Sequence, residues 1–265
     1  MVKIKFPDGA IRSYESGLTP YEIASSISSG LARSIISSDF NGQKIETTTQ
    51  IFDDGNLTFY TWKDNEGKEA FWHSTAHLLA QVLEEFYDGI KLTIGPAISN
   101  GFYYDVDFGE HSMSEKDFLK IEKRMIEIAR EKHEFKLRSI SKKEALDFYK
   151  KNRNQYKTEL IENLKDGEIT FCDHDNFTDL CRGGHIPHTG LIKAVKLMSV
   201  AGAYWRADQN NTQLTRVYGI SFPKQKELTE YLNLLEEAKK RDHRKLGKEL
   251  ELFTFSSKVG QGLPL

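Results

Sequence analysis

Apolar and polar residues alternate over several short stretches at the start of the chain, a pattern typical of half-buried β-strands. Residues 2–6 and 11–14 form the first two stretches, and the Asp-Gly pair at residues 8–9 between them favours a hairpin turn. Two more strands are expected, one around residues 40–46, which contain an Asn-Gly turn, and one over residues 56–62.

A helix is expected between these strands. Thr19 is a candidate N-cap, Pro20 suits the first helical position, and Glu22 completes a capping box. Residues 23–27 then place apolar side chains on one helical face. A hairpin, one helix and further strands predict a small α+β roll of the β-grasp (ubiquitin-like) kind over residues 1–63.

A second pattern follows the polar residues 63–68, which we expect to be a linker. Apolar residues recur at helical spacing from about His73 to Tyr87, and capping boxes that begin at Ser114 and Ser141 predict two more helices. Strands are expected in residues 102–108, 168–172, 196–200 and 216–222. These elements predict a second α+β domain, with helices packed on a mixed or antiparallel sheet, over residues 64–224.

The last part of the chain is helical at first and then apolar. Residues 225–248 keep an apolar stripe at helical spacing and end in a basic run from Lys239 to Lys248. Residues 249–265 are rich in apolar groups and stop abruptly. We therefore expect them to be the truncated start of a further domain in a larger protein.

The composition narrows the function classes only slightly. The 39 acidic and 37 basic residues give a net charge of −2, so a nucleic-acid site would have to be a local patch. No apolar run reaches the ~20 residues of a membrane span, and no signal-peptide core follows the start. Two cysteines cannot form a disulfide framework, and we expect a reducing, cytoplasmic location.

Two local motifs carry the candidate chemistry. HSTAH places His73 and His77 four residues apart, on one face of the expected helix. CRGGH places Cys181 and His185 around two glycines, which let the backbone turn tightly close to a ligand. Imidazoles suit the proton transfers of ester or amide hydrolysis near neutral pH, and Asp179 could orient an imidazole or hold an amine.

The same motifs allow other interpretations. Two histidines in an amphipathic helix can be ordinary polar side chains, whereas two His joined by Cys and His from a turn also make a zinc-type ligand set. Cys172 fits a buried small apolar residue. Tyr103 and Tyr104 alternate on a strand, so one is expected in the core and the other could stack on a base.

Longer segments resemble a known family. Residues 1–63 resemble a TGS domain, named for threonyl-tRNA synthetases, certain GTPases and the stringent-response enzymes. Further segments closely resemble segments of bacterial threonyl-tRNA synthetases, in order and over essentially the whole chain: HSTAH, GPAISNGFYYDVD, YKTELI, FTDLCRGGHIP, AGAYWRADQNN and KRDHRKLGKELELF. The chain is identified as similar to the N-terminal part of this class II synthetase family.

The resemblance implies a set of domains. Residues 64–224 would be an editing domain of the threonyl/alanyl-tRNA synthetase second additional domain type. Residues 225–248 would be a linker helix, and residues 249–265 the start of the aminoacylation domain. The zinc and ATP/Mg²⁺ sites of that domain have no counterpart in this sequence, so we expect no cofactor here and no synthesis of threonyl-tRNA by this chain.

Without the aminoacylation domain, the resemblance implies that the activity of this chain is editing. A synthetic pocket made for threonine excludes serine, which lacks one methyl group, by only ~10–200-fold. A second site that admits serine and rejects threonine by its bulk supplies the rest of the discrimination. The chain is therefore expected to hydrolyse mischarged seryl-tRNA(Thr).

Site roles come from the same resemblance, residue by residue. His73 would position or activate the hydrolytic water. Lys157 would stabilise the oxyanion or protonate the leaving ribose oxygen, and Asp179 would bind the seryl ammonium group. The remaining matches would line the pocket (His77, Cys181 and His185) or approach the terminal adenosine (Gly95 and Tyr104).

The resemblance also sets expectations about metal and partners. The family's editing site is thought to work without metal, so no metal ligand is assigned, although alanyl-type editing domains with the same His and Cys pattern can hold zinc. The family commonly has Pro or Val where Gly184 stands, so a looser turn is expected here. The expected partner is the acceptor end of tRNA(Thr), with a phosphate contact from the basic run. No membrane contact is expected, and the full-length enzyme would dimerise through the missing domain.

Two alternatives belong to other function classes. The chain could be a non-catalytic RNA-binding or regulatory module, in which the TGS domain matters and the histidines only pack. It could also be a free-standing zinc-dependent aminoacyl-tRNA deacylase.

Overall fold

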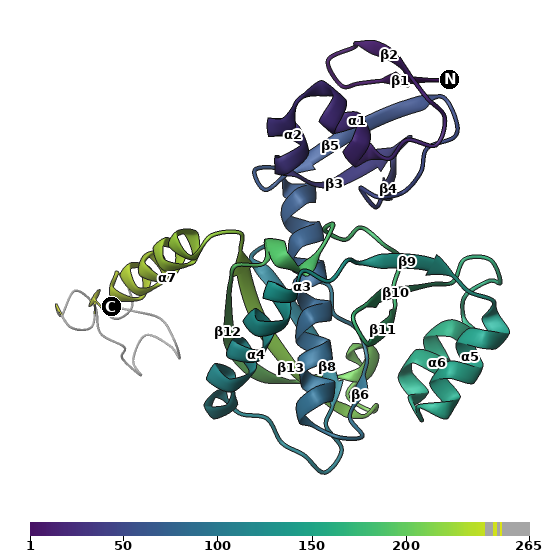
Figure 1. The fold of residues 1–265 in the computed structure, drawn as a ribbon. Helices are drawn as coiled ribbons and strands as arrows, with labels where there is room; N and C mark the ends of the chain where they lie inside the picture. The colour runs from purple at the N-terminus through teal and green to yellow at the C-terminus, as the bar shows by residue number, and fades with distance from the viewer. Residues whose placement is uncertain (242–245, 248–249, 251–265) are drawn as a thin grey trace, which may run out of the picture. The chain divides into compact units, whose positions relative to one another are not determined.

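The structure, a computed structural model, describes residues 1–241, 246, 247 and 250 (Figure 1). Its contacts divide the chain into two units, of which the first comprises Met1–Pro223 and the second begins at Lys224. The first unit contains three β-sheets with helices between them, so the expected α+β class is confirmed.

The first sheet has five strands in the order β2-β1-β5-β3-β4. The central pair, β1 and β5, is parallel, whereas the other pairs are antiparallel. These strands are β1 (Val2–Lys5), β2 (Ile11–Tyr14), β3 (Ile35–Phe40), β4 (Gln43–Ile45) and β5 (Gly55–Thr61). Two helices, α1 (Pro20–Ile27) and α2 (Ser29–Ser34), connect the first hairpin to β3, as the β-grasp prediction requires.

The helix start predicted at Thr19 is confirmed. The Thr19 hydroxyl accepts a hydrogen bond from the Glu22 N–H, and the Glu22 carboxylate accepts one from the Thr19 N–H, so the capping box is complete. The apolar face of α1 inserts Ile23 into a core with Ile4 and Leu57, all three fully buried. Burial of this size stabilises each side chain by about 1.5–3 kcal/mol.

The long helix α3 (Asn65–Phe86) begins two turns before the position that the apolar spacing indicated. The linker predicted at residues 63–68 is therefore wrong. Its polar side chains lie on the solvent face of the first helical turn, where polarity reflects exposure and not a loop. Gly67 faces inward, and a Cβ there would lie 2.0 Å from the Thr61 carbonyl oxygen. Only glycine allows the helix to leave β5 so closely.

The second sheet has strands β12-β13-β8-β6, with β7 paired to β8, all antiparallel. Helix α3 packs on β8 and β13, and α4 (Phe118–Glu131) packs on α3 and β12. These strands are β6 (Lys91–Leu92), β7 (Ala97–Ile98), β8 (Gly101–Asp107), β12 (Ala194–Tyr204) and β13 (Gln213–Phe222). The Trp72 indole donates to the Ser221 carbonyl at 3.0 Å, which fixes the helix on the sheet.

The third sheet carries the cysteine-containing segment. It has the order β11-β10-β9, with β9 (Lys136–Ser139), β10 (Thr170–His174) and β11 (Phe177–Leu180). Helix α5 (Lys142–Lys151) starts at the predicted Ser141 capping box, and the predicted box at Ser114 leads through the 3₁₀ turn Glu115–Asp117 into α4. Helix α6 (Gln155–Glu162), with eight residues, was not predicted from the sequence.

The second unit contains α7 (Gln225–Lys240), which starts where the apolar stripe predicted a helix. The rest of the expected linker helix, with most of the basic run, and the expected domain start at 249–265 lie almost entirely outside the described residues.

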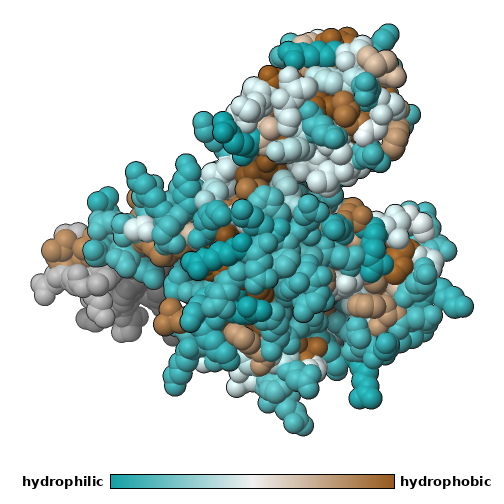
Figure 2. Space-filling model, in the orientation of Figure 1, coloured by the Kyte–Doolittle hydropathy of each residue, from teal (hydrophilic) through white to brown (hydrophobic). Residues whose placement is uncertain are grey.

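No helix among the described residues combines the length and the apolar character that crossing a membrane requires. On the first unit, Figure 2 shows a largely hydrophilic surface with apolar residues in small groups.

Candidate active site

Several pieces of chain that are distant in sequence line one cavity of about 470 Å³. Helix α3 supplies the two histidines of HSTAH, and β11 with the turn after it supplies the aspartate and the cysteine. Lysine from α6 and glycine from the segment before β7 also line it, so the lining includes these residues singled out from the sequence: His73, His77, Asp179, Cys181, Lys157 and Gly95. Six of the eight residues singled out from the sequence therefore share this cavity.

The turn is tied to α3 by a buried hydrogen bond. The Ile186 N–H donates to the Ser74 hydroxyl at 3.0 Å, and the same hydroxyl donates back to the Ala70 carbonyl. The i, i+4 spacing puts both imidazoles toward the turn, with ring centroids 4.7 Å apart. His77 is buried, whereas His73 keeps partial exposure to solvent. His73 is thus the histidine that water can reach.

A buried ion pair lies at one end of the cavity. Lys157 Nζ lies 2.5 Å from Asp179 Oδ1, and both side chains are at most 4% exposed. His77 Nδ1 lies 3.3 Å from Asp179 Oδ2, but it is not aligned as a hydrogen bond. Burial alone would raise the pKa of Asp179, yet the Lys157 ammonium and His77 hold that pKa below its ordinary value. Asp179 is therefore ionised at neutral pH.

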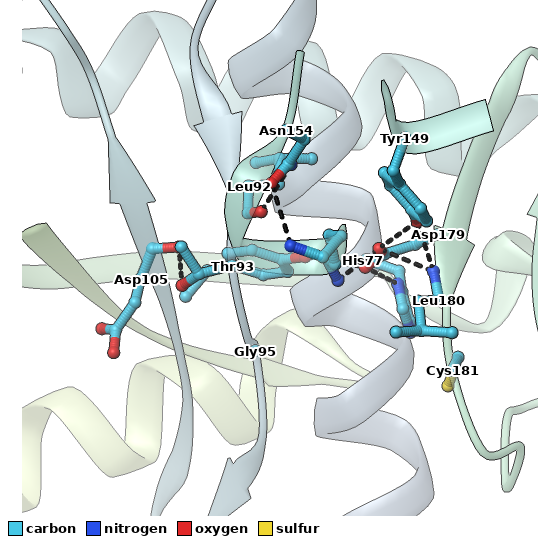
Figure 3. Close-up of polar contacts among 12 residues, drawn as sticks. His77, Leu92, Thr93, Gly95, Asp105, Tyr149, Asn154, Asp179, Leu180 and Cys181 are labelled. Carbon is cyan, nitrogen blue, oxygen red and sulfur yellow. Dashed lines mark hydrogen bonds and ion pairs between the residues drawn. The ribbon is translucent and has the colours of Figure 1, made fainter. Parts of the chain in front are cut away.

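Two buried tyrosines hold the carboxylate in place. The Tyr104 hydroxyl donates to Asp179 Oδ2 at 2.7 Å. The Tyr149 hydroxyl lies 3.3 Å from Asp179 Oδ1 while it accepts from the Leu180 N–H (Figure 3). Burial, and then the Asp179 charge, raises the pKa of both phenols well above its usual range. The tyrosines therefore stay protonated and act as donors.

Tyr104 lies beneath the cavity wall. A Cβ on Gly95 would come within 2.2 Å of the Tyr104 ring, so glycine is required for this close approach. Tyr104 is 1% exposed and is the core member of the Tyr103–Tyr104 pair, whereas Tyr103 packs against the Arg216 guanidinium. A contact of Tyr104 with an adenosine stays a prediction.

Lys157 is positioned by the start of α6. The Asn154 side chain accepts from the Lys157 N–H as an N-cap. Its amide donates to the Leu92 carbonyl at 2.8 Å (Figure 3). The second bond ties α6 to β6. Because of it, the lysine enters the cavity from a fixed direction.

Cys181 lies at the centre of a cluster of nitrogen atoms. Its sulfur is 3.0 Å from His73 Nε2, 3.2 Å from His185 Nε2 and 3.4 Å from the Gly183 N–H. Burial alone would raise the pKa of this thiol, but His73, His185 and His77 lower it well below its usual range. Burial alone would lower the pKa of His185, but the Cys181 thiolate together with the hydrogen bonds to Cys172, Cys181 and Glu46 raises that pKa well above its usual range. The arrangement favours a thiolate beside an imidazolium.

Comparisons with known proteins agree with this architecture. The TGS domain family matches residues 2–61, and the family described as Threonyl and Alanyl tRNA synthetase second additional domain matches residues 169–218. Along its whole length the chain is 69% identical to threonine–tRNA ligase of Flavobacterium johnsoniae and 67% identical to that of Flavobacterium psychrophilum. The threonine–tRNA ligase of Porphyromonas gingivalis W83 is 58% identical.

The chain is similar over its whole length to threonine–tRNA ligases, and its matches to the TGS and second additional domain families correspond to an N-terminal fragment of such an enzyme. It spans 41% of the length of each of these relatives. The threonine–tRNA ligases are enzymes, and the family resemblance drawn from the sequence motifs is confirmed.

Glycine at position 184 suits the backbone of this turn, whereas the proline or valine expected from the threonine–tRNA ligase family would not. Gly183 and Gly184 have φ angles of +91° and +84°. Proline cannot adopt such an angle, and for valine it is strongly strained. The turn in this chain is therefore a glycine-specific conformation, tightly hydrogen-bonded and not loose.

Several side chains of the site were not singled out from the sequence, and three of them bear on its polar contacts. Tyr149 lies in the apolar stripe of α5 and gives no local signal, and Glu46 belongs to a different domain from the residues it contacts. Arg182 lines the cavity rim directly after Cys181, so its place in the CRGGH motif could have revealed it.

The four residues of the two motifs also fit a zinc ion. The ligand atoms of His73, His77, Cys181 and His185 lie within 4.8 Å of one another. Ligand atoms of tetrahedral zinc lie ~3.3–3.8 Å apart, so a small contraction would suffice, and three nitrogens with one sulfur suit this metal. The metal-free site expected from the sequence remains a prediction.

Two buried groups beside the cluster have no assigned role. Burial raises the pKa of the Cys172 thiol to about 11, so this cysteine stays a neutral packing residue, as its sequence context predicted. Neither ring nitrogen of His174 has a hydrogen-bond partner among the described residues, and burial lowers the pKa of His174 to about 3.

His174 is expected to make the fold sensitive to acid. Its pKa is lower in the folded state than the ~6.5 of an unfolded histidine, so unfolding takes up a proton between these values. The contribution of His174 to the free energy of unfolding is complete above pH 6.5. Below that pH the free energy of unfolding falls by about 1.4 kcal/mol per pH unit, or by about 2 kcal/mol at pH 5. Urea unfolding of wild type and His174→Leu at several pH values measures the difference. Parallel pH profiles for the two proteins would contradict the assignment.

Proposed function

We propose that this chain hydrolyses seryl-tRNA(Thr) as the editing module of a threonine–tRNA ligase. The observation that carries the proposal is a water-accessible imidazole, His73, in the same cavity as the buried Lys157 ammonium and Asp179 carboxylate. Together they supply a base, a positive charge for an oxyanion, and an anion for the substrate ammonium group.

The reaction breaks the ester bond between the seryl carbonyl carbon and the terminal ribose oxygen. His73 takes a proton from water as the water oxygen bonds to that carbon, and Lys157 stabilises the negative charge on the carbonyl oxygen. The ester bond then breaks, and the ribose oxygen receives a proton from the His73 imidazolium or from Lys157. Serine and tRNA with a free hydroxyl are the products.

Asp179 has two tasks in this proposal. It keeps Lys157 in the cavity, and it binds the ammonium group of the seryl residue, since its lowered pKa keeps it charged. The wall behind His73 is formed by His77, Cys181 and His185. His73 Nε2 contacts the Cys181 sulfur, and this contact fixes the orientation of the His73 ring. Gly95 also lines the cavity, and its carbonyl oxygen lies 3.4 Å from His73 Nδ1.

Other activities are proposed for the longer protein. By analogy with the relatives, residues beyond this chain would attach threonine to tRNA(Thr) with ATP and Mg²⁺, hold a zinc ion and form a homodimer. The acceptor end of tRNA(Thr) would be the shared partner of both sites, in the cytoplasm.

Hydrolysis of seryl-tRNA(Thr) and threonyl-tRNA(Thr) by the wild-type chain tests the proposal. We expect the seryl ester to be lost at least ~10-fold faster than the threonyl ester, because one methyl group discriminates by about that much or more. The buffer-only rate is the reference. If neither ester is lost faster than in buffer, the chain is not an editing enzyme, and the non-catalytic RNA-binding module becomes the better interpretation.

A second candidate, a zinc-dependent aminoacyl-tRNA deacylase, is favoured by the four-ligand cluster alone. If three of the four residues held a zinc ion, its fourth position would be open to water, which the zinc would activate as a Lewis acid. Elemental analysis of protein purified without chelators distinguishes the two, since this candidate requires about one zinc per chain. Zinc-free protein that still hydrolyses seryl-tRNA would exclude it.

A further inference from the structure

The editing cavity is held from behind by a carboxylate of the N-terminal domain. Glu46, directly after β4, is 5% exposed. Its Oε1 lies 2.9 Å from His185 Nδ1 and 3.1 Å from the Gly184 nitrogen, and its Oε2 lies 3.1 Å from the His185 nitrogen. One carboxylate therefore accepts three N–H groups of the CRGGH turn.

This arrangement fixes where a proton lies on His185. An ionised carboxylate only accepts hydrogen bonds, so the contact requires a proton on Nδ1. The other ring nitrogen of His185, Nε2, lies 3.2 Å from the Cys181 sulfur. The same sulfur lies 3.0 Å from His73 Nε2. A chain of contacts thus runs from Glu46 through His185 and Cys181 to His73.

The backbone contacts add a geometric role. The turn has positive φ at Gly183 and Gly184, and the Gly184 N–H donates to Glu46. A proline at position 184 would have neither this φ nor this N–H. In this chain the glycine turn and the Glu46 carboxylate form one unit.

We propose that Glu46 is a positioning residue of the editing site, contributed by the TGS domain, which orients His185 and through Cys181 the ring of His73. The inference rests on the proposed editing function. It assigns the N-terminal domain a part in the hydrolytic step itself, because the histidine wall of the cavity is incomplete without that domain.

Glu46→Met tests the inference, since methionine keeps the length of the side chain and removes both acceptor oxygens. We expect kcat for seryl-tRNA hydrolysis to fall about 10- to 100-fold, the loss found when metal-bound histidines lose the group that orients them, with KM within about threefold. Glu46→Gln, which retains one acceptor oxygen, should recover part of kcat.

The matched control is Glu69→Met. Glu69 on α3 pairs with Lys44 of β4 at 2.8 Å and is exposed, so it also links the two domains without touching the cavity. This variant should keep kcat within about twofold, and melting curves of both variants give the folded fraction. If Glu46 only held the domains together, folded Glu46→Met protein would keep the wild-type kcat, and the inference would be overturned.

A readout independent of hydrolysis separates this inference from the proposed function. In ¹⁵N spectra of the histidine rings, assigned with a His185→Gln variant, wild-type His185 should show a protonated Nδ1 that Glu46→Met shifts and Glu69→Met does not. If wild type fails to hydrolyse seryl-tRNA, the proposed function fails and this spectrum alone decides on Glu46. An unchanged His185 signal in Glu46→Met would refute the positioning role.

Discussion

Replacing Lys157 by methionine is expected to slow seryl-tRNA hydrolysis about 10²–10³-fold, the loss usual for one oxyanion-stabilising donor. The ammonium lies in the cavity and is 3% exposed, so no solvent cation replaces it readily. The same change leaves the buried Asp179 carboxylate without its closest partner. The free energy of unfolding should therefore fall by about 3–5 kcal/mol.

A double variant separates the two effects. Adding Asp179→Asn to Lys157→Met removes the unpaired charge, so most of the lost stability should return, whereas the hydrolysis rate should stay low. Urea unfolding and initial rates of ester loss measure both quantities. Lys165→Met, at an exposed lysine that follows α6, is the control and should change the rate less than about twofold. Wild-type hydrolysis by folded Lys157→Met would remove this lysine from the mechanism.

The parts of the fold that the sequence predicted are those with local causes. The capping boxes at Thr19 and Ser141 are complete in the structure because every atom involved lies within three residues. Helix α6 was not predicted, although its cap, Asn154, accepts from a backbone N–H only three residues on; what only the structure reveals is the bond from Asn154 to Leu92, which is distant in sequence. The early start of α3 was missed because an exposed helical turn and a loop have the same polarity.

The residues of the site likewise divide into those that a local sequence motif indicates and those that only the structure reveals. The HSTAH and CRGGH motifs identified His73, His77, Cys181 and His185 as a group because each pair is set by local spacing, and the structure brings the pairs together. No local pattern indicates that Glu46, 139 residues before His185, accepts from its ring. Contacts of this kind arise only when two domains pack, so they appear only in the structure.

His73→Ala is expected to lower kcat for seryl-tRNA hydrolysis about 10²–10⁴-fold, the range for loss of a general base. Of the four residues in the cluster, His73 alone is partly exposed, so its loss should cost little stability. The alanine leaves a space that opens into the cavity. Millimolar imidazole should therefore restore part of the rate by replacing the missing ring.

Imidazole rescue distinguishes a base from a packing residue, because a free imidazole can accept a proton from water without rebuilding the wall of the cavity. His111→Ala serves as the control, since that histidine is held by the Asp88 carbonyl and does not line the cavity. It should hydrolyse seryl-tRNA at the wild-type rate and gain nothing from imidazole. If His73→Ala also kept the wild-type rate, the water would have to be activated by another group, and the cavity-lining carboxylates Glu168 and Asp179 and the imidazole of His77 would be the candidates to test next.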